Sequence, residues 1–349
     1  MTGRQRVIAA FNFKQSDKIP IDINAHPSSG INAAAYSKLR KYLNLPAGPI
    51  YIYDPAQQLA IVENDVLDYF DADTFQLGCD LNKKPEYWKD WRLEDGAPCK
   101  IPAAYNKNLL MPVNIKKLRE TAAKTRDSTD RAIYGVFGGS LFETGCSVFG
   151  MDNFLCNLLA APDRAKKFLD TVTEKHMENL KAYLYSAGKN IDIIGFNDDM
   201  GTQNAAMFSP DIYMDFFFPR QKMMWSYVHE NFPEIKICLH CCGAVRPLIP
   251  LFIEAGLDAV NPVQFDCKNM ALDALKKEFH GRLTLWGGGC NAENMLPHIK
   301  PQDICSHVKE NCDTLYSGGG FIFQPVHNIL SNMPAENIAR MYKTVREFA

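Results

Sequence analysis

Long apolar segments are missing from this 349-residue sequence. No uninterrupted apolar run approaches the roughly 18 residues that a membrane-spanning helix needs. Residues 1–11 form an amphipathic pattern and lack the continuous apolar core of a signal peptide. We therefore expect a cytoplasmic protein that does not contact membranes.

Basic runs with interleaved aromatic residues are also missing. The formal net charge is −2 at pH 7, so the chain offers no broad positive surface to a polyanion. Binding to nucleic acid depends mainly on such a surface. The composition therefore argues against a nucleic-acid partner.

Cysteine, in contrast, is abundant. The chain has 11 cysteines, an odd number. In a large chain without a secretion signal, this favours thiols and metal ligands over a disulfide framework. Most of these cysteines have no ligand-type spacing, and a buried cysteine usually behaves as a small hydrophobe.

Short apolar segments alternate with helical patterns along the chain, and each pair spans some tens of residues. This alternation predicts one α/β domain over residues 1–349, a (β/α)8 TIM barrel, with a small hairpin inserted near residues 85–101. The predicted strands are 18–23, 74–77, 132–137, 191–196, 236–240, 259–263, 283–287 and 320–323.

The helices between these strands are predicted from apolar spacing and end signals. Residues 162–187 have a proline in the first turn and a glycine just after the end, which is typical of a helix. Residues 56–70 and 209–231 are also expected to be helices. The alternative fold is a doubly wound open sheet, which is disfavoured because no Gly-x-Gly-x-x-Gly follows the first strand.

The segment from Lys236 to Gly243 carries the clearest chemical signal. Alternate side chains of a strand share a face, so His240 and Cys242 are expected to point the same way as Cys238, and Cys241 the other way. One imidazole and one thiolate are good donors for Zn²⁺. We therefore predict that His240 and Cys242 bind a metal.

Two further residues could complete this metal site. Active-site groups of such barrels gather at the carboxyl ends of the strands. Cys290 follows the glycines at 287–289 after the seventh strand, and His327 follows the eighth. Cys290 is the better third ligand by chemistry, because a thiolate is a good Zn²⁺ donor and the glycines let its loop reach across the barrel mouth. His327 competes for the third or fourth position.

Acidic and amide side chains follow the other strands. Asp199 and Glu143 are the candidate catalytic groups, as general acid or base or as partners that orient a ligand. Adjacent side chains diverge, so only one carboxylate of the Asp198–Asp199 pair is expected to face the pocket. The remaining residues expected to bind substrate are Asn197, Asp198, Gln203, Gln264 and Asn328.

Several motifs, in order along nearly the whole chain, resemble those of the uroporphyrinogen decarboxylase superfamily. They include residues 4–12 and 17–22 near the start. The others are Asp198-Asp-Met-Gly-Thr-Gln203, His240-Cys-Cys-Gly243, Asn261-Pro-Val-Gln264 and Phe323-Gln-Pro-Val-His327-Asn-Ile. The resemblance implies the barrel fold and an enzyme.

The resemblance also distinguishes two activities. Decarboxylases of this superfamily carry an arginine-rich segment after the first strand, which binds the acidic side chains of the porphyrinogen. Here residues 23–30 contain no arginine. The chain is more similar to the zinc-dependent methyltransferases, whose ligands follow a His-x-Cys…Cys pattern; His240 and Cys242 match the first two.

The resemblance to this branch implies a reaction and its partners. A methyl group would move between a small methylated molecule or a thiol and the cobalt of a corrinoid, with Zn²⁺ activating the heteroatom. The corrinoid would be carried by a partner protein. The alternative is decarboxylation of a porphyrinogen.

Overall fold

The computed structural model describes residues 1–78, 85–93, 95–103, 115–292 and 297–348. Its centre is a seven-stranded sheet in which every neighbouring pair is parallel. The strands, in spatial order, are β12 (Phe321–Ile322), β10 (Thr284–Trp286), β9 (Ala259–Asn261), β8 (Lys236–His240), β7 (Ile193–Asn197), β6 (Ala132–Gly138) and β3 (Thr74–Gln76).

The first predicted strand closes this sheet, although it contributes only an isolated β-bridge. Ile21 bridges Phe323 in parallel orientation, and the N–H of Asp22 donates to the Phe323 carbonyl at 2.9 Å. On the other side, the N–H of Asp73 donates to the Ile21 carbonyl at 2.8 Å. The segment therefore occupies the eighth strand position between β12 and β3, and the predicted barrel is confirmed.

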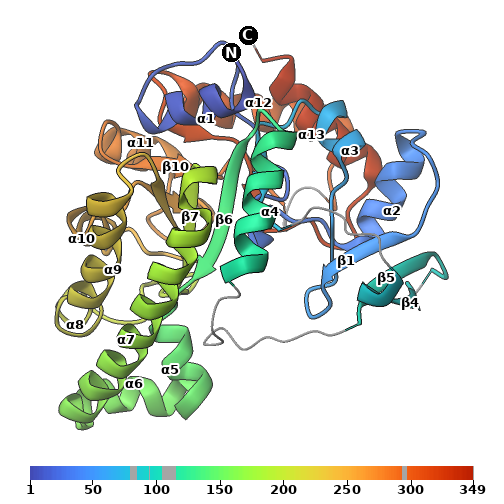
Figure 1. The fold of residues 1–349 in the computed structure, drawn as a ribbon. Coiled ribbons are helices and arrows are strands. Elements are labelled where there is room, and N and C mark those ends of the chain that lie inside the picture. The colour runs from blue at the N-terminus through green and yellow to red at the C-terminus, as the bar shows by residue number, and fades with distance from the viewer. Residues whose placement is uncertain (79–84, 94, 104–114, 293–296, 349) are drawn as a thin grey trace.

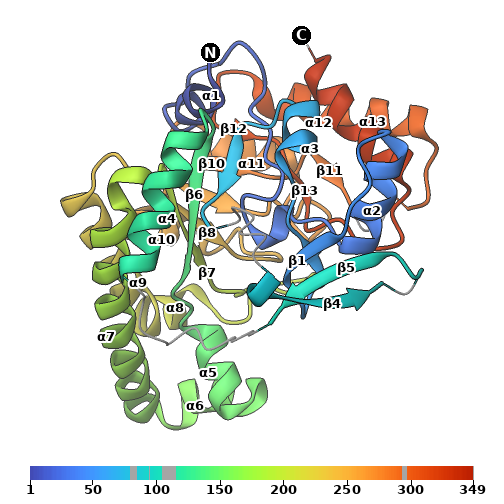
Figure 2. The ribbon, with the colours of Figure 1, turned by 45° about the vertical axis from the view of Figure 1, so that its right-hand side comes forward.

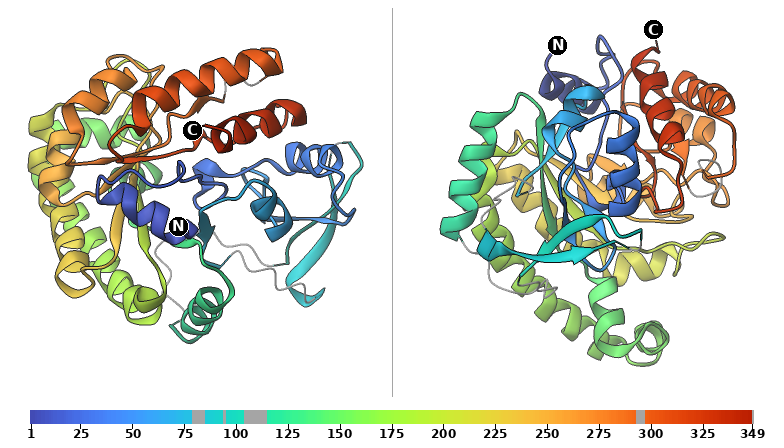
Figure 3. Two further views of the ribbon diagram at one scale, coloured as in Figure 1. Left: turned by 90° about the horizontal axis from the view of Figure 1, so that it is seen from above. Right: turned by 90° about the vertical axis from the view of Figure 1, so that its right-hand side faces the viewer.

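Helices form an outer layer around the curled sheet (Figures 1 and 3). The helix α7 (Pro162–Ala187) has the predicted bounds. The layer also contains α2 (Ala33–Tyr42), α3 (Asn64–Tyr69), α4 (Ile115–Ser128), α10 (Ile249–Ala255), α11 (Leu272–Phe279), α12 (Pro301–Tyr316) and α13 (Ala335–Arg346). Three short 3-10 turns lie in the connections: η1 (Pro27–Ser29), η2 (Pro85–Tyr87) and η3 (Gly188–Asn190).

The interior of the barrel holds its own apolar cluster. Cys238, Tyr134 and Trp286 belong to it, together with Val7 and Phe11 of helix α1 (Gly3–Phe11), which closes the amino-terminal end of the barrel. Leu239 and Cys241 instead pack in the larger core between sheet and helices. The alternation of side chains along β8 is therefore as predicted.

The predicted hairpin is present as β4 (Trp88–Arg92) and β5 (Pro98–Pro102), which pair antiparallel; Glu94 of its turn lies outside the described residues. The hairpin extends a second sheet of order β2-β1-β5-β4, beside the barrel (Figure 2). Its other strands are β1 (Ile50–Asp54) and β2 (Leu59–Ala60).

The helix predicted at residues 56–70 is wrong in its first half. The Asp54 carboxylate accepts the N–H of Ala56 at 2.8 Å, which closes a turn, and Gln58 has φ of +55°. The positive φ of Gln58 ends this turn before a helix can continue, and the N–H of Ala60 then donates to the Ile31 carbonyl. Only residues 64–69 are helical.

Two further corrections concern helices near the barrel mouth, the end where the strands have their carboxyl termini. Residues 209–231 form two helices, α8 (Pro210–Phe216) and α9 (Phe218–Asn231), because a proline in the first turn of α9 interrupts the bonding. Between β6 and α7 lie two unpredicted helices, α5 (Phe142–Phe149) and α6 (Met151–Ala160), which extend below the barrel in Figure 1.

No helix in the described part of the chain is both long and apolar enough to cross a membrane.

Candidate metal site at the barrel mouth

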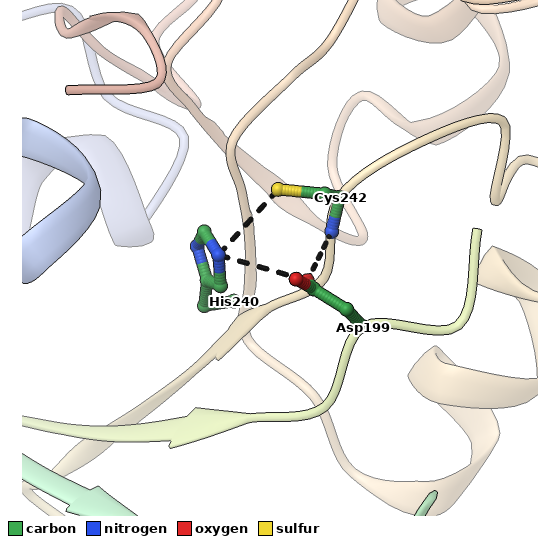
Figure 4. A group of neighbouring side chains, drawn as sticks. All are labelled: Asp199, His240 and Cys242. Atoms are coloured by element: carbon green, nitrogen blue, oxygen red, sulfur yellow. Dashed lines mark hydrogen bonds and ion pairs between the residues drawn. The ribbon is translucent and has the colours of Figure 1, made fainter. Parts of the chain in front are cut away.

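Three ligand-type side chains meet at the ends of β7 and β8. Nε2 of His240 lies 3.5 Å from Sγ of Cys242 and 3.6 Å from Oδ1 of Asp199 (Figure 4). One ligand atom from each residue lies within 4.8 Å of the other two. His240 ends β8, whereas Asp199 and Cys242 lie in the loops that follow β7 and β8. Two neighbouring strands therefore supply one group of an imidazole, a thiol and a carboxylate.

The spacing of these atoms fits a tetrahedral zinc ion. Zinc bonds of roughly 2.0–2.3 Å to nitrogen, oxygen and sulfur place neighbouring ligand atoms about 3.3–3.8 Å apart. The two distances from His240 Nε2 fall in this interval. Three protein donors with one remaining position are the arrangement of catalytic zinc sites. The residues present therefore fit the ion that the motifs imply.

The imidazole of His240 is oriented by a buried amide. Its Nδ1 lies 2.9 Å from Oδ1 of Asn261, at the end of β9. Burial lowers the pKa of His240, which favours the neutral ring. The bond to Asn261 directs Nε2 toward Asp199 and Cys242.

A second histidine covers the ring of His240. His26 stacks on it with ring centroids 4.8 Å apart and an interplanar angle of 28°. His26 is only 2% exposed, and burial, followed by the proximity of His240, lowers its pKa well below the usual value. Both rings are therefore neutral near pH 7.

Two glycines bring the ligand loops together. A Cβ atom on Gly201 would lie 2.4 Å from the Cys242 carbonyl oxygen, so only glycine permits this approach. Gly243 has φ of +94° and packs against Gly201 in turn. The N–H of Gly243 donates to Oε1 of Gln264 at 2.9 Å, and the N–H of Cys242 donates to Oδ1 of Asp199 at 2.8 Å. Backbone contacts thus determine the distance between the Asp199 and Cys242 loops.

The thiol of Cys242 is protonated in the absence of a metal. Burial raises its pKa above the usual range, and the neighbouring Asp199 carboxylate raises it further. A cation reverses this effect, because it stabilises the thiolate directly. A metal ion bound at this group of residues would therefore release a proton from Cys242.

Asp198 points away from the site. Its carboxylate accepts the backbone N–H groups of Leu141, Phe142 and Glu143 at 2.9–3.0 Å, at the start of α5. Burial raises the pKa of Asp198 to about 7, against the opposing effect of these donors. Both oxygens are thus engaged in holding a helix, and this geometry gives no support to the predicted role in substrate binding.

Glu143 lies in the first turn of α5, on the side of Asp199. Burial raises its pKa to about 7, and the nearby Asp198 and Asp199 carboxylates act in the same direction. A carboxyl group with this pKa can gain or lose a proton near neutral pH. The predicted acid–base role of Glu143 is therefore chemically possible.

Neither alternative ligand belongs to the group at His240 in the described part of the chain. Cys290 begins β11 (Cys290–Asn291), which pairs with β13 (Pro325–Val326). It is completely buried, and it raises the pKa of Cys312 and Tyr342 on α12 and α13, so its thiol is near these helices.

His327 is closer to the site. It lowers the pKa of His26 and of His240, and its own Nδ1 lies 3.0 Å from Oδ1 of Asn328. Its φ of +63° is rare for a residue with a side chain. His327 thus flanks the site without joining the three ligand atoms.

The remaining predicted substrate residues mostly bind other parts of the chain. Asn197 accepts a hydrogen bond from His26, and Asn328 donates to Gln57 at 3.1 Å. Gln203 accepts the thiol proton of Cys267 at 2.8 Å. These residues, like Gln264, shape the mouth, and their contact with substrate stays a prediction.

Sequence reasoning missed three residues at the mouth: His26, Asn261 and Gln76. His26 follows the first predicted strand and Asn261 ends β9, so their positions at strand ends were the available signal. Gln76 ends β3 and pairs in register with the interior residue Tyr134. Its buried Oε1 has no hydrogen-bond partner in the described part of the chain, so it could accept one from a ligand.

A family model described as uroporphyrinogen decarboxylase (URO-D) matches residues 60–348. Among solved structures, a methyltransferase from Methanosarcina mazei aligns with a TM-score of 0.66 and 18% identity, covering 100% of this chain and 99% of that chain. This likeness shows a common fold.

A 2,3-dimethylmalate lyase of the PEP mutase/isocitrate lyase superfamily aligns with a TM-score of 0.35 and 12% identity, over 91% of this chain and 86% of that chain, which is too distant to support an argument. No curated protein matches the sequence.

Proposed function

Because the chain belongs to the uroporphyrinogen decarboxylase family, whose members are enzymes, we propose that it is a zinc-dependent methyltransferase. It would move a methyl group between a small methylated molecule or thiol and the cobalt of a corrinoid protein. The group of Asp199, His240 and Cys242 is the observation that carries the proposal. The likeness to the Methanosarcina mazei methyltransferase, over nearly the full length of both chains, is consistent with it.

His240, Cys242 and Asp199 would hold the zinc ion and leave one position for the substrate. When bound, zinc supplies Lewis acidity: it lowers the pKa of a thiol acceptor or polarises the heteroatom that releases the methyl group. Asp199 in place of a second thiolate makes the donor set harder and more electrophilic than a His–Cys–Cys set.

The protein's own groups would orient the substrate and manage its proton. Glu143 lies near Asp199, with a pKa of about 7, and could take the proton of an acceptor thiol or return one to a leaving oxygen. The stacked rings of His26 and His240 are neutral and largely buried, so they add no charge next to the open metal position. This suits a small uncharged methyl donor or acceptor.

Metal analysis tests the site. We expect about one zinc per chain in the wild type and loss of most of it in the His240→Ala/Cys242→Ala double variant. The matched control is Cys241→Ala, because Cys241 is adjacent but packs in the outer core. Full zinc retention by the double variant would refute the assignment.

Methyl transfer tests the reaction. Purified protein would be incubated with cob(I)alamin and a panel of methylated oxygen, nitrogen and sulfur compounds, and with methylcobalamin and thiols for the reverse direction. We expect one substrate class to change the cobalamin absorbance, and we expect a chelator or Cys242→Ala to prevent the change.

The second candidate is a decarboxylase, since the matching family model carries that description. Residues 23–30, after the first strand, have no arginine or lysine, so they offer no charge to a substrate with many carboxylates. Turnover of uroporphyrinogen that survives chelation would favour the decarboxylase over the methyltransferase.

A further inference from the structure

We propose that Asn261 and His26 are positioning residues that fix His240 in one tautomer and one orientation, with Nε2 as its metal-binding atom. The inference rests on the proposed function, because it concerns the same site. It differs from the ligand assignment in that neither residue would touch the metal.

The orientation of the Asn261 amide follows from its neighbours. Nδ2 lies 3.2 Å from the Trp286 carbonyl oxygen, which can only accept, so the nitrogen must be on that side. Oδ1 therefore faces Ser28 and His240, at 2.7 and 2.9 Å. The hydroxyl of Ser28 and Nδ1–H of His240 are then the donors to this oxygen.

Gln324 supports the same orientation independently. Its Nε2 donates to the Ser28 carbonyl oxygen at 3.0 Å, again an atom that only accepts. Its Oε1 must then accept from Nδ2 of Asn261, at 2.7 Å. The two backbone carbonyls of Trp286 and Ser28 thus determine the orientation of the Asn261 and Gln324 amides. The buried Asn261 amide then makes four hydrogen bonds, two as acceptor and two as donor.

This network determines the tautomer of His240. Because Oδ1 of Asn261 can only accept, the ring proton must be on Nδ1. In a neutral ring, Nε2 then carries a lone pair, and this is the atom that lies beside Cys242 and Asp199. The ring is ready to bind a cation without a change of tautomer.

His26 restricts the plane of the same ring and is itself fixed at both nitrogens. Its Nδ1 accepts the N–H of Ser28 at 3.1 Å, so its proton is on Nε2, which donates to Oδ1 of Asn197 at 3.2 Å. His26 therefore has no lone pair left for a metal. Rotation of His240 would break both the stack on His26 and the bond to Asn261.

Two variants of Asn261 separate positioning from stability. Asn261→Asp and Asn261→Leu both lose the Nδ2 donors to Trp286 and Gln324, but only the aspartate can still accept from His240 Nδ1. We expect Asn261→Leu to weaken Zn²⁺ and Co²⁺ binding by about 10–100-fold and Asn261→Asp to stay within a few-fold of wild type. Competition with a chromophoric chelator measures the affinity.

A second pair of variants tests the stack. His26→Phe keeps an aromatic ring over His240, whereas His26→Leu does not. We expect a roughly tenfold loss of metal affinity for His26→Leu and a smaller one for His26→Phe. In the Co²⁺ form, thiolate charge-transfer absorption would report whether Cys242 remains bound. Equal, wild-type affinity in Asn261→Leu and His26→Leu would overturn the positioning role.

The tautomer is measurable without metal or variant. Nitrogen-15 NMR of the wild-type protein, with the His240 signals identified by their loss in His240→Gln, should show Nδ1 protonated and Nε2 bare. A protonated Nε2 would overturn the proposal whatever the metal data. Wild-type protein that shows the expected tautomer but binds no zinc would instead refute the proposed function and leave the positioning geometry intact.

Discussion

A methyl group placed on Gly243 would lie 2.5 Å from the carbonyl carbon of Gly201, so the loops that follow β8 and β7 touch backbone to backbone. This contact sets the distance between the two ligand loops. It brings the carboxylate of Asp199 within 2.8 Å of the Cys242 N–H.

Gly243→Ala should therefore separate Asp199 from Cys242. The alanine would also strain the backbone, since φ is +94° at this position. We expect zinc affinity to fall at least about tenfold. Gly48→Ala is the control, because a Cβ there meets no atom within 4 Å. Unchanged affinity in Gly243→Ala would show that the glycine contact does not set the site.

Alanine substitutions of Asp198 and Asp199 should affect different properties, the first mainly stability and the second mainly zinc binding. Asp198→Ala leaves the N–H groups of Leu141, Phe142 and Glu143, at the start of α5, without this acceptor and should lower the free energy of unfolding by about 2–4 kcal/mol. Asp199→Ala removes one acceptor, that of the Cys242 N–H, from a side chain that is 42% exposed, so it should cost only about 0.5–1.5 kcal/mol, but it should weaken zinc binding. Urea unfolding and metal titration of both variants distinguish the roles.

Cys290→Ala should retain zinc. Its thiol is buried near α12 and α13, so the substitution leaves a small cavity and should cost about 1 kcal/mol of stability. Zinc content and thermal unfolding are measured on the same sample. Loss of zinc from a folded Cys290→Ala protein would instead make this cysteine a ligand.

His176 should contribute to acid destabilisation. Its Nε2 is 3.0 Å from the Ser140 carbonyl, and burial lowers its pKa below the unfolded value of about 6.5. Below about pH 6.5, His176 is protonated in the unfolded chain but still neutral in the folded protein. The free energy of unfolding therefore falls as the pH drops toward the pKa of His176 in the folded protein.

In the His176→Gln variant, neither the folded nor the unfolded state binds a proton at this position. The fall in unfolding free energy between pH 6.5 and pH 5 should become shallower by up to about 1.4 kcal/mol per pH unit. Glutamine can still donate to Ser140, so stability at pH 8 should change little. Urea titrations across this range measure the slope, and an unchanged slope would mean that His176 is protonated in the folded protein.

The barrel could be predicted because each strand is a short apolar run between helical patterns, as in residues 236–240 and α7. β1 was missed because its partner β5 lies some fifty residues further along and is set by tertiary contacts. The break at residue 217 between α8 and α9 was also missed. The sequence alone does not show whether a proline in a helical pattern kinks one helix or begins a second one.

At the site, strand alternation was sufficient to group His240 with Cys242 and to exclude Cys241. The divergence of Asp198 and Asp199 was expected, but which one faces the pocket depends on α5, a helix that sequence reasoning missed. The position of His26 after the first strand could have suggested a place at the mouth, but its contact with Asn197 spans 171 residues and leaves no periodic signal. The metal role of these residues stays a prediction.

The bridge between Ile21 and Phe323 constrains how the chain folds. During synthesis, almost the whole chain must emerge before these residues can meet. The strands from β3 to β10 can pair earlier, since each joins a neighbour close in sequence order. Closure therefore needs the contact with the largest sequence separation in the barrel, and any chain that has not yet made it carries two unpaired sheet edges, which favour aggregation.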